Sequence, residues 1–210
     1  MRLYLVRHGD TEIGRDGLYP DGGGLTALGR RQAAATAERL RSAGLTHIVT
    51  SSLQRARETG APLAEMTGLR PFEVPGFDEV RIGRLREAPI ESINQRIYGT
   101  SPRADFSEFG GEASAEFNRR VLSTLSREIV DRYCELDTAV AAFVHGGTIS
   151  VILDHAEGIE FDGDLHREIP NGSISSMVIK DGRMRLEHGP DSRHLEGVGI
   201  TNMHGPRDDR

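Results

Sequence analysis

The sequence is short of the features that define several other classes of protein. It has one cysteine, Cys134, so the chain can form neither an internal disulfide nor a zinc site built from several thiolates. It contains no run of about 18 apolar residues, which excludes a typical membrane-spanning helix. The opening residues, MRLYLVRHGD, do not have the pattern of a signal peptide. We therefore expect a cytoplasmic protein that does not act at a membrane.

Lysine is almost absent as well. Lys180 is the only lysine among 26 basic residues, and codon bias in a GC-rich genome accounts for most of this imbalance. A P-loop requires a lysine followed by serine or threonine, whereas Lys180 is followed by Asp181, so the chain has no P-loop. Lys180 also lies in a polar turn, which does not suit a Schiff-base or kinase-type lysine. Recognition of phosphate by arginine remains open.

What the sequence does contain is typical of one folded domain. Of its 210 residues, 37% are hydrophobic and 28% are charged, which is enough to form a core. The net charge of −6 argues against a general nucleic-acid or anionic-membrane binder. We expect a single domain over residues 1–196, with a cap insertion at about 80–111, and a loose tail over 197–210.

Strand and helix patterns alternate along most of the chain. Apolar residues recur at every fourth position at Phe117, Val121, Leu125 and Ile129, which indicates the buried face of a helix. The pair Asp181-Gly182 is typical of a hairpin turn. Alternation of this kind predicts a three-layer α/β/α fold whose sheet is mainly parallel and has an antiparallel edge. The expected strands are 2–6, 46–50, 70–74, 138–144, 173–180 and 183–188, and the expected helices are 27–43, 53–67, 112–132 and 148–155.

Three of the expected strands end in residues suited to binding an anion. The first ends in Arg7-His8-Gly9, and the fourth ends in His145-Gly146-Gly147. The second leads into Ser51-Ser52, which can cap a helix that carries Arg55 in its first turn. Because ligands bind at the carboxyl ends of strands in such sheets, these side chains should converge. Arginines and helix N-termini together favour a phosphate group.

A histidine in such a site can also react with phosphorus. Neutral imidazole is a nucleophile at physiological pH, and arginines can stabilise the charge of the phosphoryl group as it transfers. A carboxyl group must protonate the leaving alcohol. Glu79 is the candidate for this proton donor because it opens the cap insertion. Asp10 is the alternative. Asp78, next to Glu79, is chemically similar to it.

Seven motifs, in family order over about residues 2–195, resemble those of the histidine phosphatase superfamily, also called phosphoglycerate-mutase-like proteins. Together they are far more specific than the R-H-G tripeptide alone. The motifs are LYLVRHGDTE (3–12), TSSLQRARET (50–59), FDEV (77–80), GGEASAEFNRRV (110–121), VHGG (144–147), PNGSI (170–174) and RHL (193–195).

The resemblance implies roles for the matching positions. His8 would be phosphorylated, and Glu79 would donate the proton. The first motif commonly continues to an asparagine that binds phosphate, but Gly14 stands there, while Thr11 still offers a hydroxyl. No metal or organic cofactor is implied, and the cap would contact the substrate. The phosphate-binding positions would be Arg7, His8, Thr11, Arg55, His145 and Gly146.

The predicted function is hydrolysis of a small phosphomonoester through a phosphohistidine. A phosphoglycerate mutase is the alternative, although cofactor-dependent mutases read R-H-Y-G after the acid where this chain has Val80-Arg81-Ile82-Gly83. A non-catalytic phosphate-binding protein is the second alternative. The expected partner is the small-molecule substrate, with neither nucleic acid nor membrane, and a homodimer is left open.

Overall fold

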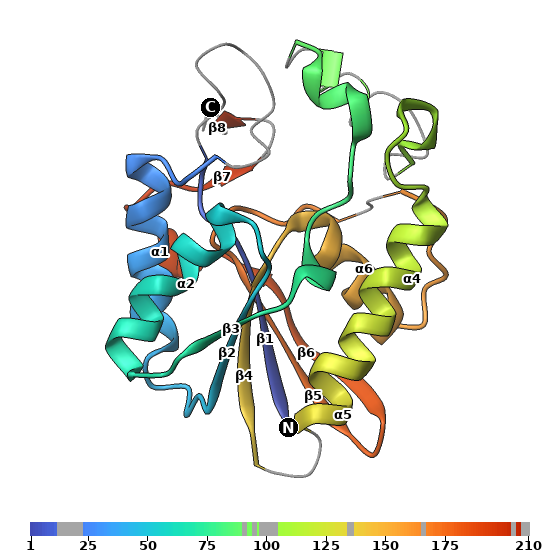
Figure 1. Ribbon diagram of the computed structural model, residues 1–210. Coiled ribbons are helices and arrows are strands. Elements are labelled where there is room, and N and C mark those ends of the chain that lie inside the picture. The colour runs from blue at the N-terminus through green and yellow to red at the C-terminus, as the bar shows by residue number, and fades with distance from the viewer. Residues whose placement is uncertain are drawn as a thin grey trace.

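The computed structural model describes residues 1–11, 23–89, 92–93, 96, 105–133, 137–164, 167–202 and 205–206. A six-stranded sheet forms the centre of the described part, in the order β3-β2-β4-β1-β5-β6 (Figure 1). The first four strands in this order are parallel, whereas β5 runs antiparallel to both of its neighbours. The strands are β1 (Arg2–Arg7), β2 (His47–Thr50), β3 (Pro71–Glu73), β4 (Ala139–Val144), β5 (Ile174–Lys180) and β6 (Arg183–Asp191).

Helices cover both faces of the sheet (Figure 1). Alternate residues of β1 and β4 point to opposite sides, so Leu5 and Val140 pack with α4 and α6, while Val6 and Phe143 pack with α1 and α2. This arrangement confirms the predicted three-layer α/β/α fold. Among the described residues, the helices on the two faces of the sheet are α1 (Ala27–Leu40), α2 (Gln54–Thr67), α4 (Ser114–Thr124), α5 (Asp131–Tyr133) and α6 (Gly146–Ala156).

Local sequence signals explain where several elements begin and end. The Thr26 hydroxyl accepts a hydrogen bond from the Gly29 N–H at 2.9 Å and caps α1. Gly68 ends α2 in the left-handed conformation, with φ of 69°. Asp181 and Gly182 form the turn between β5 and β6, both with positive φ.

The helix expected at 112–132 differs in detail from the prediction. It begins at Ser114 and changes after Thr124 into a π-helical stretch, η4 (Leu125–Val130), before α5. The whole expected apolar stripe is nevertheless buried, so the spacing predicted the buried face but not the hydrogen-bond pattern. Helix α6 begins at Gly146, two residues before the expected start, because His145 is already its N-cap.

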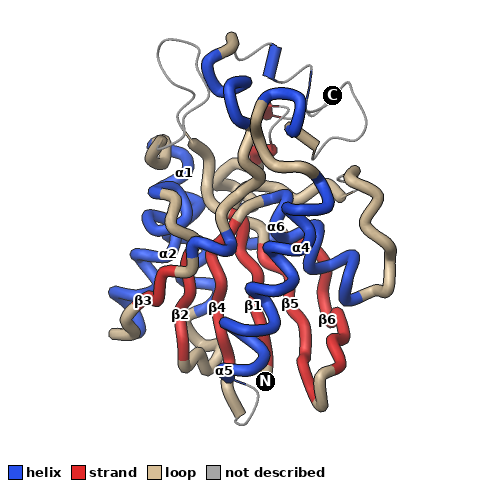
Figure 2. Tube along the Cα trace, turned by 45° about the vertical axis from the view of Figure 1, so that its right-hand side comes forward, coloured by secondary structure: helices blue, strands red, loops and turns tan. Residues whose placement is uncertain are grey.

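The cap lies above the end of the sheet where the parallel strands terminate (Figure 2). Its described residues share a small hydrophobic core of Ile82, Leu85, Ile93 and Phe106. This core gives the insertion packing of its own.

The short 3₁₀ turns among the described residues are η1 (Pro75–Phe77), η2 (Gly83–Glu87), η3 (Ser107–Phe109) and η5 (Arg193–Leu195).

The segment expected to be a loose tail, 197–210, is attached to the domain in its described part. Thr201 is buried, its carbonyl accepts a hydrogen bond from the Asn171 N–H at 2.7 Å, and its hydroxyl lies 3.1 Å from Gln32 Nε2. Two short strands, β7 (Thr201–Asn202) and β8 (Gly205–Pro206), pair with each other.

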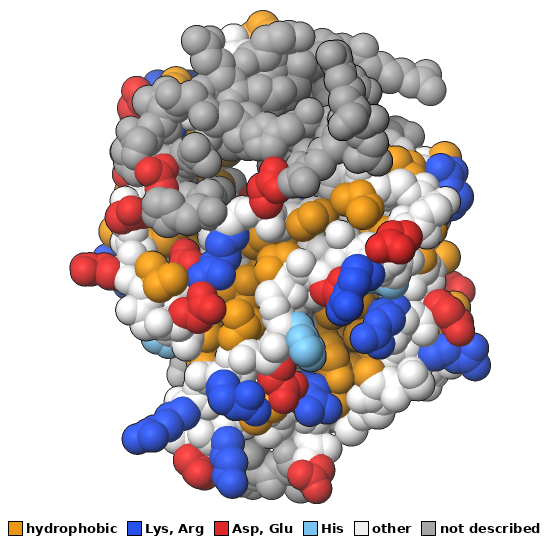
Figure 3. Space-filling view, turned by 180° about the vertical axis from the view of Figure 1, so that it is seen from behind, with side chains coloured by type: hydrophobic (Ala, Val, Ile, Leu, Met, Phe, Trp, Pro, Cys, Tyr) orange, Lys and Arg blue, Asp and Glu red, His pale blue; other side chains and the backbone are white. Residues whose placement is uncertain are grey.

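The surface seen from behind carries basic and acidic side chains intermingled, with no large patch of one sign among the described residues in view (Figure 3). No helix in the described part of the chain is long and apolar enough to cross a membrane.

Candidate active site

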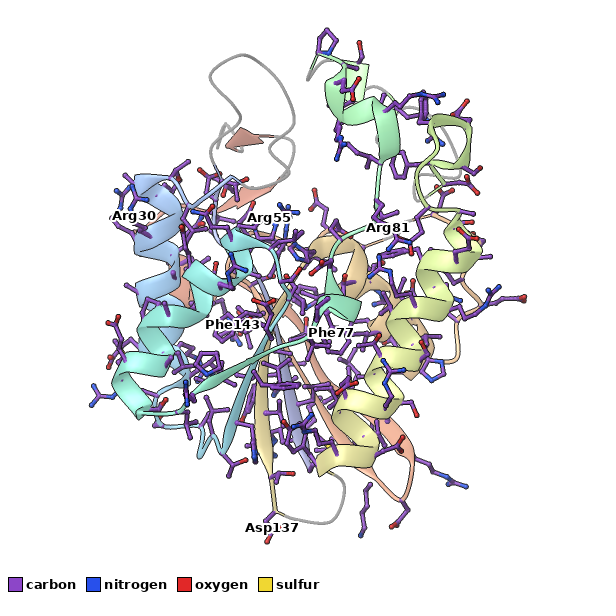
Figure 4. All side chains as sticks on the ribbon, in the orientation of Figure 1. Arg30, Arg55, Phe77, Arg81, Asp137 and Phe143 are labelled. Atoms are coloured by element: carbon purple, nitrogen blue, oxygen red, sulfur yellow. The ribbon has the colours of Figure 1, made fainter. Side chains whose placement is uncertain are left out.

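The fold brings together four of the five side chains expected to bind a phosphoryl group. Arg7 ends β1 and pairs in register with Val144, so His8 and His145 leave the sheet side by side. Their rings lie 5.2 Å apart between centroids. Arg55 enters from the first turn of α2 at the same end of the sheet, far from Asp137 at the other end (Figure 4). Each of the four side chains is more than nine-tenths buried.

His8 is held with one ring nitrogen ready to react. Its Nδ1 lies 2.8 Å from the Gly9 carbonyl oxygen, which can only accept, so Nδ1 carries the proton and Nε2 keeps its lone pair. Burial lowers the pKa of His8 well below its ordinary value, and the charges of Arg55 and Arg7 lower it further. The imidazole is therefore neutral at physiological pH, as a nucleophile must be.

The backbone of the His8 loop is also fixed. The Asn171 amide donates to the carbonyl oxygens of His8 at 3.0 Å and Gly9 at 3.3 Å. The Gly9 N–H donates to the Thr59 hydroxyl at 3.0 Å. These contacts join the loop to α2 and to the segment before β5, so protein contacts alone fix the backbone that carries His8.

The two ring nitrogens of His145 differ in their contacts. Its Nε2 lies 2.7 Å from the Ser51 hydroxyl, whereas its Nδ1 is buried without a hydrogen-bond partner among the described residues. Burial lowers the pKa of His145 well below its ordinary value, with further lowering by Arg55, His8 and Arg7. If Ser51 donates to Nε2, the ring proton lies on Nδ1 and can bind a phosphoryl oxygen.

Ser51 and Ser52 do not cap α2, contrary to expectation. The N-cap position belongs to Leu53, which has no side-chain cap, and α2 begins at Gln54. Ser51 contacts His145 instead, and Ser52 contacts Asp78. Both serines therefore organise the site, a role that a helix-start pattern cannot distinguish from capping.

The three candidate acids are now distinguishable. The Asp78 carboxylate accepts hydrogen bonds from the Ser52 N–H at 2.8 Å and hydroxyl at 2.6 Å, and Asp10 accepts from the Thr26 hydroxyl at 2.7 Å. Both carboxylates therefore accept hydrogen bonds from neighbouring segments that hold them in structural roles. Glu79 accepts from the N–H groups of Gly147 and Val80, each at 3.0 Å, so its carboxylate lies against the first turn of α6 next to His145, whereas the cavity beside Arg55 is lined by both Asp78 and Glu79. This placement favours Glu79 as the acid.

Gly146 and Thr11 are the other two positions expected to bind phosphate. Gly146 begins α6, so its N–H belongs to the first turn, where backbone donors have no partner within the helix. Thr11 forms a backbone bridge to Leu25, and no hydrogen bond among the described residues links its hydroxyl to His8. Gly14, which stands where the family resemblance led us to expect an asparagine, lies outside the described residues.

A cavity of about 820 Å³ lies beside Arg55 and Glu79 and is bounded by the cap, and Arg7, His8 and His145 are not among the described residues that line it. Arg55 and Arg81 lie on facing sides of the space above the sheet (Figure 4). Within the described ranges, no group of three or more histidine, cysteine, aspartate or glutamate residues could hold a metal ion. The cavity is lined by Arg55, Glu79, Arg81, Ile82, Arg84 and Phe109, among others.

Replacing Gly147 with alanine should lower activity without unfolding the protein. A Cβ atom there would lie 2.4 Å from Glu79 Oε1, so the carboxylate would have to move away from the Gly147 N–H. A displacement of this size at a reacting group costs about 100-fold in rate. Phosphatase kinetics and a thermal melt of Gly147→Ala would check this, and an unchanged kcat would contradict it.

Comparison with known proteins is consistent with this geometry. A profile of the histidine phosphatase superfamily (branch 1) matches residues 3–191. The "probable phosphoglycerate mutase GpmB" of Yersinia enterocolitica is 30% identical over 97% of this chain and 99% of its own length. A mycobacterial glucosyl-3-phosphoglycerate phosphatase is similar in structure, with a TM-score of 0.76 and 26% identity over 91% of this chain and 99% of that one.

The fold alone is shared with YhfR of Bacillus stearothermophilus, with a TM-score of 0.81 and 21% identity over 92% of this chain and 98% of that one. The profile match covers nearly the whole domain and includes every strand of the central sheet. The chain therefore belongs to the histidine phosphatase superfamily.

Proposed function

We propose that this protein hydrolyses small phosphomonoesters through a phosphohistidine at His8. The observation that supports this most strongly is a neutral, oriented imidazole whose Nε2 is free to react beside two buried arginines. Arginines that flank a nucleophile stabilise charge on the transferring phosphoryl oxygens, which is the main requirement of such a reaction.

The proposed reaction has two steps, phosphorylation of His8 and hydrolysis of the phosphohistidine. In the first, His8 Nε2 attacks phosphorus, the P–N bond forms, the P–O ester bond breaks, and Glu79 gives its proton to the leaving alcohol. In the second, Glu79 takes a proton from water as the water oxygen attacks phosphorus, the P–N bond breaks, and inorganic phosphate leaves. Arg7, Arg55 and the Nδ1–H of His145 bind the phosphoryl oxygens in both steps.

A mutase would share the first step and differ only in what accepts the phosphoryl group. The relative in Yersinia enterocolitica, named as a phosphoglycerate mutase, favours that alternative, and the mycobacterial phosphatase favours hydrolysis. We prefer hydrolysis because the sequence after Glu79 is Val80-Arg81-Ile82-Gly83 rather than the R-H-Y-G of cofactor-dependent mutases.

The test is to follow 3-phosphoglycerate and a panel of other phosphomonoesters by phosphorus NMR, with and without 2,3-bisphosphoglycerate. We expect release of inorganic phosphate, ranked by kcat/KM over the panel, and unchanged rates in EDTA. Conversion of 3-phosphoglycerate to 2-phosphoglycerate faster than phosphate release would favour the mutase. Binding without turnover of any ester would favour a non-catalytic protein.

A further inference from the structure

We propose that the ion pair between Arg120, which is partly buried, and Glu112, which is buried, positions Glu79 for proton transfer; this rests on the acid role proposed above. Arg120 lies on α4 and does not line the cavity, yet its guanidinium contacts the loop that carries Glu79. Its NH1 donates to the carbonyl oxygens of Gly76 and Asp78, both at 2.9 Å, and its NH2 donates to that of Glu79 at 3.3 Å.

The remaining donors of Arg120 go to a single carboxylate. Its Nε donates to Glu112 Oε1 at 2.8 Å, and NH2 donates to Glu112 Oε2 at 2.7 Å. These five hydrogen bonds use all five N–H groups of the guanidinium. Arg120 therefore has no donor left for a substrate, and its role is to fix the backbone around Glu79.

Glu112 extends this contact to the other side of Glu79. Its N–H donates to the Arg81 carbonyl oxygen at 2.8 Å, and its carboxylate accepts from the Arg81 side chain at 3.2 Å. Burial opposes ionisation of the Glu112 carboxyl, but hydrogen bonding and the charges of Arg120 and Arg81 keep its pKa below the ordinary value. The pair thus stays charged and holds residues on both sides of Glu79.

The loop has little freedom to adjust if this pair is lost. Phe77 is buried, and its carbonyl oxygen accepts from the Thr148 hydroxyl at 3.2 Å. A Cβ at Gly76 would lie 2.2 Å from Thr124 Oγ1, so α4 and the loop are in close contact. Hydrogen bonds therefore fix every carbonyl from Gly76 to Glu79, and Arg120 supplies three of the four.

The experiment uses the basicity of the leaving group. A poor leaving group, such as the alcohol of an alkyl phosphate, needs a proton as the ester bond breaks, whereas 2,4-dinitrophenolate leaves without one. We expect Arg120→Gln and Arg120→Lys to lower kcat/KM, which reports the phosphorylation step alone, at least about 10-fold more for an alkyl phosphate than for 2,4-dinitrophenyl phosphate. Lysine keeps the charge but offers three donors without the planar fork, so it should not restore the rate.

Glu79→Gln is the reference variant and should show the same selectivity for the leaving group. The double variant with Arg120→Gln should lose little more activity than Glu79→Gln alone, because both changes impair the same proton transfer. Arg119→Gln is the matched control, since Arg119 is the neighbouring arginine on α4 and is exposed. It should leave both rates unchanged.

Equal losses on the two substrates, or no loss, would overturn the positioning role of Arg120. If Arg120→Gln does not fold, as judged by a thermal melt, Glu112→Gln tests the pair instead, because it keeps the shape of the side chain and removes the charge. Equal losses or no loss there would likewise overturn the proposal. A failure of the proposed function is distinct: Glu79→Gln would then lack selectivity, or His8→Ala would remain active.

Discussion

Replacing His8 with alanine is expected to abolish turnover of every phosphomonoester, with a loss in kcat of at least about 10⁴-fold. The reason is that, in the proposed mechanism, Nε2 of His8 forms the bond to phosphorus, and the other imidazole buried beside the two arginines, that of His145, has its Nε2 against the Ser51 hydroxyl. The arginines remain, so inorganic phosphate should still bind and can be measured by calorimetry.

His155→Ala is the matched control for this variant. His155 is an exposed histidine in the last turn of α6, so its loss should leave kcat and KM unchanged. Retention of wild-type kcat in His8→Ala would contradict the mechanism, since no intermediate on this residue would then be required.

The second large effect is expected from Arg55→Met. The guanidinium of Arg55 is buried, and its charge contributes to lowering the pKa of both His8 and His145. Its loss should lower kcat about 10³-fold, because charge on the phosphoryl oxygens is no longer neutralised in the transition state.

Arg55→Met should also change the pH dependence. In the wild-type enzyme His8 stays neutral as the pH falls through the ordinary range of histidine, so it can still react. Without the positive charge of Arg55 the pKa of His8 rises, and the acidic limb of kcat/KM moves to higher pH. A pH-rate profile on one substrate, with histidine titration by NMR, would measure both changes.

Arg57→Met is the control for this pair of effects. Arg57 lies two residues further along α2, is exposed, and contacts Glu73 at 3.1 Å. Exposed ion pairs contribute little to stability, so the activity of Arg57→Met and its pH dependence should be unchanged. Similar losses in the Arg55 and Arg57 variants would show that the site does not depend on the position of Arg55.

The cluster of Arg7, His8, Arg55 and His145 could be predicted from sequence for a physical reason. Arg7 ends a parallel strand and the other three residues follow one, and the carboxyl ends of parallel strands meet at one edge. The fold was predictable for a related reason, because alternating strands and helices have few ways of packing into layers.

The supporting residues could not be predicted, because their contacts join segments far apart in the chain. Arg119 and Arg120 look alike in sequence, and only the packing of η1 against α4 directs one of them to the loop of Glu79. Asp78 and Glu79 are likewise similar until the Ser52 contact selects Asp78 for a structural role. Ser51 resembles a helix cap until β4 places His145 beside it.

The most direct test of the central claim is to trap the covalent intermediate. The enzyme would be mixed with 2,4-dinitrophenyl phosphate, denatured at alkaline pH within its first turnovers, digested, and analysed by mass spectrometry. We predict one added phosphoryl group on the peptide that contains His8, located at that residue by fragmentation, and none in His8→Ala. Rapid turnover with no phosphorylated peptide, or with the phosphoryl group on another residue, would contradict the mechanism.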